Sequence, residues 1–202
     1  PPPLPDLRDY SVGFATPVPA GVGATKWGVM LAVHTAFPCL KRYSLDAGPL
    51  TGRMAAADIV IRPAASGSPA ATVRVVGVYC PHSEDPGAVR SFWRAMAEFI
   101  SAADTPALWV MAGDMNATLD PSESSLMHYQ ENAASAEFRW FLHEIGASDA
   151  WNEQDDCEIG KDFTHRLDAP PHTLKILDRV AHSFRPEEVT VRQRGFVSGT
   201  DH

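Results

Sequence analysis

The chain has 202 residues, 45% of them hydrophobic, and a formal net charge of −8 at pH 7. This length and composition suffice for one compact domain, and the acidic balance excludes a global basic field for nucleic acid. An anionic substrate would therefore have to be met by individual arginines or by a bound cation. No apolar stretch reaches membrane-spanning length, and the three cysteines lack the spacing of a disulfide framework or a zinc site, which predicts reduced, buried thiols.

The first part of the chain is divided by its composition. Residues 1–27 are rich in proline and glycine and show no sustained period, which predicts an irregular N-terminal arm. A domain is expected over 28–202. Within it, the apolar run over 28–34 predicts a first strand, and the run over 53–61 predicts the strand that pairs with it, ended by Pro63.

A strand followed by a helix comes next. The β-rich run over 72–79 ends in Tyr79, so this strand brings a polar aromatic side chain to the edge of the sheet. Asp85-Pro86 then predicts a helix start, because the acid caps backbone N–H groups and proline suits the first turn. The apolar residues that follow recur at helical spacing: Val89, Phe92, Trp93, Met96, Phe99 and Ile100. This stripe predicts a helix packed on the sheet.

The same alternation repeats downstream. Residues 108–114 form a short apolar run that predicts a buried strand, ended by Gly113 and Asp114. A second helix is predicted over 133–145, with apolar residues on one face and Gly146 at its end. Strand, helix, strand, helix is the pattern of an α/β domain.

The last third of the chain predicts two more strands. One spans 174–183 and holds Asp178 among apolar residues, where a charge is costly unless it has a partner. The other spans 188–194, and the printed sequence closes with Asp201 and His202.

The stretch around Asp114 carries the clearest chemistry. Asp114 and Asn116 are two residues apart at the end of a predicted strand, so their side chains can point the same way. A carboxylate can hold or deprotonate a water molecule, and an amide N–H can bond a phosphoryl oxygen whose charge grows in the transition state. The pair therefore suits hydrolysis of a phosphate ester. The alternative is a plain turn, because Gly, Asp and Asn are also common turn residues after a strand.

Six short motifs follow one another along the chain. They are Val78-Tyr79-Cys80-Pro81-His82, Gly113-Asp114-Met115-Asn116, Asp149-Ala150-Trp151, Phe163-Thr164, Ile176-Leu177-Asp178-Arg179-Val180 and Thr200-Asp201-His202. Taken in this order, they resemble the endonuclease/exonuclease/phosphatase superfamily. The resemblance covers 28–202, and its Tyr-x-Pro-His and Asp-Ala-Trp segments are most similar to the endonucleases of LINE-type retrotransposons.

The resemblance implies a four-layered α/β sandwich, the DNase I-like fold, with a divalent metal, Mg²⁺ or Mn²⁺, in a cleft at the shared edge of two sheets. By position, it implies that Asp114 orients or deprotonates the attacking water, Asn116 bonds the phosphate and Tyr79 holds a non-bridging oxygen. It also implies that Asp178 hydrogen-bonds a cationic His202, which fixes the tautomer and charge of the histidine. Asp201 matches an additional metal ligand.

Two departures from the family pattern stand out. Where relatives read Arg-Ile-Asp, this chain has Ile176-Leu177-Asp178 and then Arg179, so the usual arginine is lost or displaced to the other face. The family also opens with two strands, one with an asparagine and one ending in a metal-binding glutamate, and the sequence begins downstream of both. We therefore expect an N-terminally incomplete sandwich with weak Mg²⁺ binding, impaired hydrolysis and association through the incomplete sheet.

Three functions follow from these motifs. The first is a metal-dependent phosphodiester hydrolase that acts on nucleic acid, with DNA favoured, and has no membrane partner. The second is a phosphatase of a small phosphorylated molecule such as an inositol phosphate. The third is a non-catalytic remnant that keeps the fold without turnover. The other histidines, including His82 and His182, have no metal-type spacing and are expected to be surface or structural groups.

Overall fold

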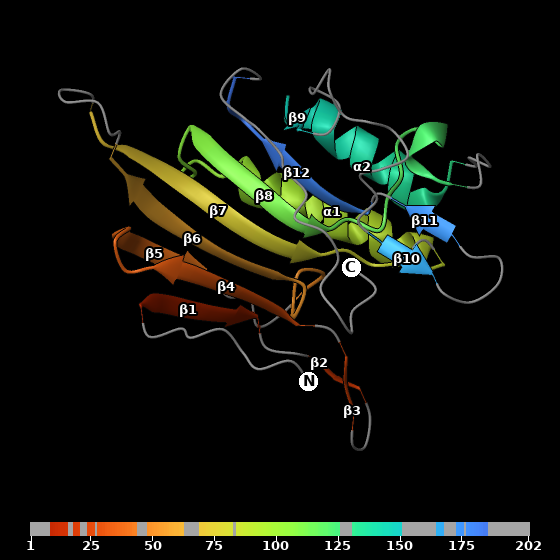
Figure 1. The fold of residues 1–202 in the computed structure, drawn as a ribbon, viewed down its shortest axis with the longest axis horizontal. Helices are drawn as coiled ribbons and strands as arrows, with labels where there is room; N and C mark the ends of the chain where they lie inside the picture. Colours follow the sequence, from red (N-terminus) through yellow and green to blue (C-terminus); the bar gives the residue numbers. More distant parts are fainter. Residues whose placement is uncertain are drawn as a thin grey trace.

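The computed structural model describes residues 9–15, 18–20, 24–26, 28–43, 48–62, 69–82, 84–125, 131–150, 165–167, 173–175 and 177–185. Figure 1 shows their arrangement. The elements are β1 (Tyr10–Ala15), β2 (Val18–Ala20), β3 (Ala24–Lys26), β4 (Val29–His34), β5 (Cys39–Tyr43), β6 (Met54–Ile61), β7 (Ala71–Tyr79), α1 (Pro86–Ile100), β8 (Leu108–Asp114), the 3-10 turn η1 (Pro121–Glu123), α2 (Ala133–Glu144), β9 (Ser148–Asp149), β10 (His165–Leu167), β11 (Thr173–Lys175) and β12 (Asp178–His182).

A six-stranded mixed sheet forms the centre of the fold. Its strand order is β5-β6-β7-β8-β12-β9. β7 and β8 run parallel, with α1 between them in the chain, while the other neighbours in the sheet are antiparallel. The carboxyl ends of β7 and β8 therefore lie beside the amino ends of β6 and β12, at one end of these strands.

Both helices cover one face of this sheet, behind β8 and β12 in Figure 1. α1 begins where the sequence predicts, because the Asp85 side chain accepts a hydrogen bond from Ala88 N at 2.9 Å. Asn132 caps α2 in the same way, and Gly146, with a φ of 61°, follows its end. The large side chains buried in this layer are Phe92, Trp93, Met96, Met111, Phe138 and Phe141. Neither α1 nor α2 has the length and apolarity that a membrane crossing needs.

β4, paired with β1, covers the opposite face of the sheet. Val33 of β4 packs in one apolar cluster with Ile59 and Val73. A Cβ on Gly77 would lie 3.0 Å from Val29 Cγ1, so β4 passes close to the backbone of β7. The described residues thus form three layers: the helices, the six-stranded sheet and the β1–β4 pair.

The structure corrects the predicted pairing of the first strands. β4 pairs with β1 and not with β6, and β1, β2 and β3 all fall within the segment predicted to be irregular. β6 has β5 along one edge and β7 along the other, which leaves no edge for β4. An apolar pattern predicts a strand but not the strand it pairs with, because the pairing depends on contacts between residues far apart in the chain.

The predicted strand over 174–183 is two strands, β11 and β12. Asp178 opens β12 and is partly exposed, so its charge does not lie inside a continuous apolar strand. β11 pairs with β10 instead of joining the large sheet. The predicted strand over 188–194 lies outside the described residues.

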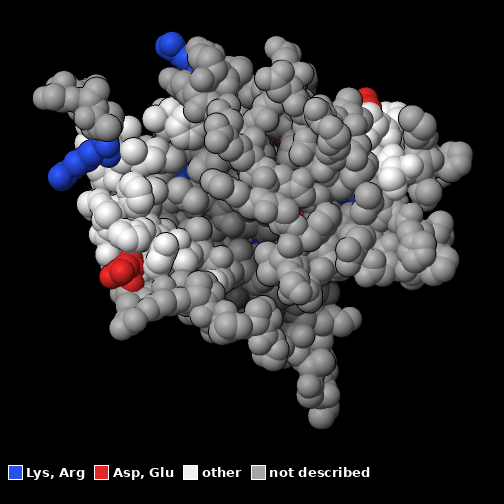
Figure 2. Space-filling view, in the orientation of Figure 1, with Lys and Arg blue, Asp and Glu red and all other residues white. Residues whose placement is uncertain are grey.

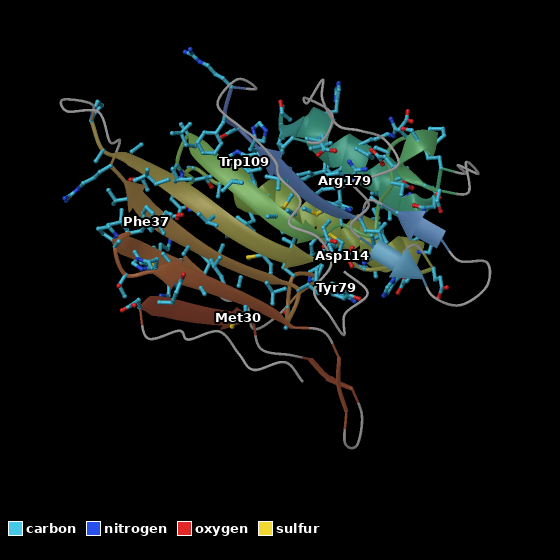
Figure 3. The ribbon with its side chains drawn as sticks, in the orientation of Figure 1. Met30, Phe37, Tyr79, Trp109, Asp114 and Arg179 are labelled. Carbon is cyan, nitrogen blue, oxygen red and sulfur yellow. The ribbon has the colours of Figure 1, made fainter. Side chains whose placement is uncertain are left out.

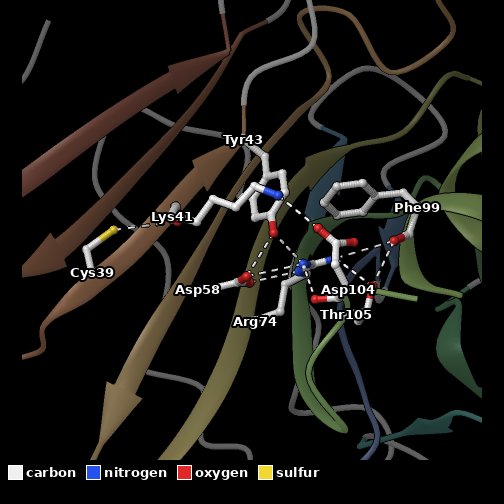
Figure 4. Close-up of polar contacts among 8 residues, drawn as sticks. All are labelled: Cys39, Lys41, Tyr43, Asp58, Arg74, Phe99, Asp104 and Thr105. Carbon is white, nitrogen blue, oxygen red and sulfur yellow. Dashed lines mark hydrogen bonds and ion pairs between the residues drawn. The ribbon is translucent and has the colours of Figure 1, made fainter. Parts of the chain in front are cut away.

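A buried guanidinium ties the helix layer to the sheet (Figure 4). Arg74 Nε donates to Asp58 Oδ1 at 2.8 Å, and its Nη1 donates to Thr105 Oγ1 at 2.6 Å. Its Nη2 donates to the hydroxyl of Tyr43 at 2.5 Å, and that hydroxyl donates to Asp58 Oδ2 at 2.8 Å. Burial and the bond to Asp58 raise the pKa of Tyr43, so the hydroxyl stays protonated. The guanidinium also lies 4.9 Å from the centre of the Phe99 ring, in α1.

We expect Arg74→Met to lower the free energy of unfolding by about 3–5 kcal/mol, because it leaves the buried Asp58 carboxylate without its ion-pair partner. Adding Asp58→Leu should restore part of that loss. Lys41→Met is the control. The Lys41–Asp104 pair is half exposed, so its loss should leave the urea midpoint of unfolding nearly unchanged. Urea denaturation measures all three, and equal losses for Arg74→Met and Lys41→Met would contradict this assignment.

Candidate active site

Three of the predicted catalytic residues lie in one row across three neighbouring strands. Tyr79 at the end of β7 is the register partner of Asp114 at the end of β8, and Asp114 is in turn the partner of Asp178 at the start of β12. Partners in a sheet point to the same face, and neighbouring strands are about 4.8 Å apart. Figure 3 shows Tyr79 and Asp114 next to each other at this edge of the sheet, with Trp109 toward the opposite end of β8.

The row faces the side of the sheet that β4 covers. Met111 of β8 is buried against the helices, so Asp114, three residues later, points to the opposite face. Tyr79 lies two residues after Gly77, which faces Val29 of β4. The site is therefore at one end of the space between the two sheets, where the resemblance expects a cleft.

Arg53 extends the row on the side of β6, and sequence reasoning missed it. Tyr79 N donates to Arg53 O at 2.9 Å, and Arg53 Nη1 donates to Tyr79 O at 3.3 Å. The guanidinium lies 5.7 Å from the centre of the Tyr79 ring. Burial lowers the pKa of Arg53 from its ordinary value, yet the group stays cationic at neutral pH. The signal in the sequence was its place just before the strand over 54–61, which runs antiparallel to β7.

His82, which closes the Tyr-x-Pro-His motif, was expected to be only a surface or structural group. Its Nε2 lies 3.1 Å from the Tyr79 hydroxyl, and the two rings meet edge to face at 6.1 Å. The structural role predicted for this histidine is therefore a contact with the hydroxyl of Tyr79, a predicted catalytic residue. His182, by contrast, is buried in the sheet. We call Arg53, Tyr79, Asp114 and Asp178 the polar row.

Asp114 and Asn116 form a tight turn that is bonded to its neighbours. Asn116 N donates to Asp114 Oδ1 at 2.8 Å, and Asn116 Nδ2 donates to Cys80 O at 2.8 Å. The φ of Asn116 is 50°, a left-handed conformation that asparagine tolerates better than most residues. The turn expected as the alternative is therefore present, and a role of the two side chains in hydrolysis stays a prediction.

The backbone around this turn joins the ends of three strands. Cys80 N donates to Asp114 O at 2.9 Å, and Met115 N donates to Leu177 O at 2.9 Å. Cys80 is fully buried, and this burial, with the nearby Asp114 carboxylate, raises the pKa of its thiol well above 9.0. The thiol therefore stays neutral and adds no charge beneath the row. Cys80 thus fits the expected reduced, buried thiols, whereas Cys39 is free but only partly buried, and Cys157 lies outside the described residues.

A divalent metal fits the acidic half of the polar row by its donor chemistry. Asp114 and Asp178 carry carboxylate oxygens, which Mg²⁺ prefers, and one or two carboxylates commonly hold this ion. Among the residues that the structure describes, no three His, Cys, Asp or Glu side chains gather into a metal site. The predicted ligand Asp201 and the predicted partner His202 lie outside the described residues, so the Asp178–His202 contact stays a prediction.

Comparison with solved structures identifies the fold. The catalytic domain of Xenopus laevis APE2 matches with a TM-score of 0.67 at 15% identity, over 87% of this chain and 66% of that one. The 3′ phosphatase NExo from Neisseria, bound to a product DNA hairpin, matches with a TM-score of 0.61 at 16% identity, over 86% and 66%. The chain has the DNase I-like fold. The predicted α/β class and the resemblance in fold are confirmed.

A retrotransposon protein shares this DNase I-like fold. The endonuclease domain of TRAS1, a telomere-specific non-LTR retrotransposon, matches with a TM-score of 0.53 at 16% identity, over 86% of this chain and 65% of that one. The chain spans just under two thirds of the length of each of these three domains. No family model and no curated protein matches the sequence.

We expect Gly113→Ala to disrupt the polar row from below. Gly113 has a φ of 145°, and a Cβ there would lie 2.0 Å from Val78 O, in the backbone of the neighbouring strand. The variant should lose about 3 kcal/mol or more of unfolding free energy. Gly146→Ala is the matched control, because its φ of 61° is also positive but its Cβ would meet nothing within 4 Å, so the loss should be about 1 kcal/mol. Similar losses in thermal unfolding would show that β7 and β8 are not in close contact at Gly113.

Proposed function

We propose that this chain is a metal-dependent phosphodiester hydrolase that acts on DNA. The observation that carries the proposal is the polar row with the Asn116 turn beside it, which brings a carboxylate, a phenol and an amide to the carboxyl ends of two parallel strands. The matched structures are named as a catalytic domain, a 3′ phosphatase and an endonuclease domain, and two further matches are TDP2 proteins, one of them in complex with a single-stranded DNA product. These names support a hydrolase on DNA.

Charge is divided along the polar row in a way that suits a phosphate. Arg53 and Tyr79 supply a cation and a hydroxyl on one side, and Asp114 and Asp178 supply carboxylates on the other. A phosphate bound between them meets donors on the first side. A water or a cation is favoured on the second.

Each residue then has a defined role. Asp114 holds the attacking water and accepts its proton. Asn116 Nδ2 carries two hydrogens, one donated to Cys80 O, and the other is proposed to bond the phosphoryl oxygen. The Tyr79 hydroxyl, oriented by His82, bonds a non-bridging oxygen. When bound, a divalent ion shields the phosphate and stabilises the leaving oxygen. Asp114, Asp178 and Asp201 are the residues proposed to hold it, and Asp178 and His202 the proposed acid–histidine pair.

Figure 2 shows one face of the molecule, and the Lys and Arg side chains that it colours stand mainly at the periphery of that face. With a net charge of −8, the chain depends on local cations such as Arg53 to meet an anionic backbone.

A second candidate is removal of a terminal phosphate from a DNA end. The observation in its favour is that the matched protein from Neisseria is named a 3′ phosphatase and is bound to a product DNA hairpin. The two activities need the same row and differ in the leaving group. No neighbour named above points to a small phosphorylated molecule, so the inositol-phosphate alternative has no such support.

We expect the purified chain to nick supercoiled plasmid only slowly in Mg²⁺, in line with the impaired hydrolysis expected from the sequence, and to lose this residual activity in EDTA. Asp114→Asn and Asn116→Ala should each lower turnover by at least about 100-fold, because one removes the base and the other an oxyanion donor. Asp104→Asn is the control, since this exposed acid pairs with Lys41 away from the row. The far-ultraviolet circular dichroism of all three variants should match that of the parent chain.

The same assay with a 3′-phosphorylated oligonucleotide separates the two candidates, because only phosphate release occurs if the second is right. Titration of Mg²⁺ by calorimetry tests the expected weak binding. If Asp114→Asn and Asn116→Ala both keep full turnover, or neither substrate is cleaved at any Mg²⁺ concentration, the proposed function is wrong.

We expect Tyr79→Phe to lower kcat by about 10- to 100-fold with little change in KM, because the lost hydroxyl bonds a phosphate oxygen mainly in the transition state. Tyr10→Phe is the matched control, because this tyrosine is exposed and contacts His34 at the distant start of β1. Steady-state kinetics with a fluorescent oligonucleotide measure both variants. An unchanged kcat for Tyr79→Phe would remove this residue from the mechanism.

A further inference from the structure

A second buried guanidinium lies beneath the polar row. Arg179, next to Asp178 in β12, points to the helix-covered face and is 1% exposed. It is the register partner of Gly113, so the two strands place it directly beside the turn at Asp114. The Arg179 side chain therefore lies on the face opposite Asp178, as one of the two alternatives left by the sequence allows.

The guanidinium of Arg179 joins three segments that are far apart in the chain. Its Nε donates to Ala117 O at 3.0 Å, in the segment that follows Asn116. Its Nη2 pairs with Glu123 at the end of η1, and its Nη1 pairs with Asp149 at the end of β9. Both carboxylates are buried, at 6% and 4% exposure.

The same network holds the backbone on both sides of Ala117. Leu119 N donates to the Glu123 carboxylate that Arg179 binds. Ser135 Oγ of α2 donates to Thr118 O at 2.7 Å. The side chains of Met115, Ala117 and Leu119 are buried, so this segment is a packed part of the core.

We infer that Arg179 is a positioning residue, which fixes segment 115–119 and thereby holds the Asn116 amide at the polar row. The inference rests on the proposed function, in which Asn116 bonds the phosphate. The left-handed φ of 50° at Asn116 is one that asparagine tolerates, and a constraint on the neighbouring backbone selects it over other conformations. The bonds of Arg179 to Ala117 and Glu123 supply that constraint immediately downstream of the asparagine.

Lysine cannot replace the guanidinium in this place. Arg179 donates in three directions from a planar fork, with separate nitrogens for one carbonyl and two carboxylates. The ammonium group of a lysine would bond fewer of these three acceptors, and it lacks the planar geometry that fixes their positions. A loss of position by about 1 Å in a catalytic group can cost about 100-fold in rate.

Arg74 provides a matched control for a purely structural effect. It is also fully buried, also bonds a carboxylate and backbone carbonyls, and lies in the middle of the sheet, five residues before Tyr79. Arg179→Lys and Arg74→Lys should both destabilise the fold. Only Arg179→Lys should change the geometry at Asn116.

The experiment compares these two variants at a temperature where each is more than about nine-tenths folded. We expect Arg179→Lys to lower kcat by about 10- to 100-fold with KM within about twofold, and Arg74→Lys to keep both values. Amide hydrogen exchange should speed up at Met115, Asn116 and Leu119 in Arg179→Lys and stay unchanged there in Arg74→Lys. If Arg179→Lys does not fold, Asp149→Asn replaces it, because asparagine keeps the shape of this partner of Arg179 and removes only its charge. Its kcat should fall less than that of Arg179→Lys, in the same direction.

Equal losses of kcat in Arg179→Lys and Arg74→Lys, or unchanged exchange at 115–119, would overturn the inference. A parent chain without any cleavage would instead refute the proposed function. In that case the exchange measurement alone decides whether Arg179 holds the segment, so the two failures are distinguishable.

Discussion

The parallel pairing of β7 with β8 is the contact on which the site depends. It sets Tyr79 level with Asp114, and the backbone bond from Cys80 N to Asp114 O continues the pairing past the ends of both strands. The strands approach so closely at Gly113 that a single methyl group there would collide with Val78 O. β12 then adds Asp178 to the same row from the other side. The groups predicted to be catalytic come from three distant parts of the sequence and meet because backbone hydrogen bonds align them.

The two faces of the sheet carry different kinds of polar residues. On the helix-covered face, Arg74 and Arg179 are buried and bonded to carboxylates, which joins the sheet to α1 and η1 and ties β12 to its neighbour β9. On the other face, the polar row stands at the end of the space toward β4. Because side chains alternate along a strand, neighbouring residues point to opposite faces. Asp178 lies in the polar row, while Arg179, on the other face, bonds the segment that follows Asn116. Buried ion pairs of this kind fix a unique arrangement more than they add stability.

Electrostatics within the row explains how an acidic chain can meet a phosphate. The net charge is −8, and two carboxylates lie side by side at Asp114 and Asp178. Arg53 places a cation beyond Tyr79, and the neutral Cys80 thiol adds no further negative charge. In the proposed function, the metal ion would offset the acidic half of the row, and Arg53 and Tyr79 would meet the phosphate directly.

Local signals in the sequence determined the helices, the ends of the central strands and the polar residues at those ends. Asp85 and Asn132 cap their helices through side-chain bonds to nearby backbone, and Gly113-Asp114 ends its strand, because each depends on residues a few positions away. Only the tertiary structure decided that β4 pairs with β1, that Arg53 stacks on Tyr79 and that Arg179 binds Asp149 and Glu123. These contacts join residues far apart in the chain, and an apolar pattern or a charge carries no record of the partner that strand register will place beside it.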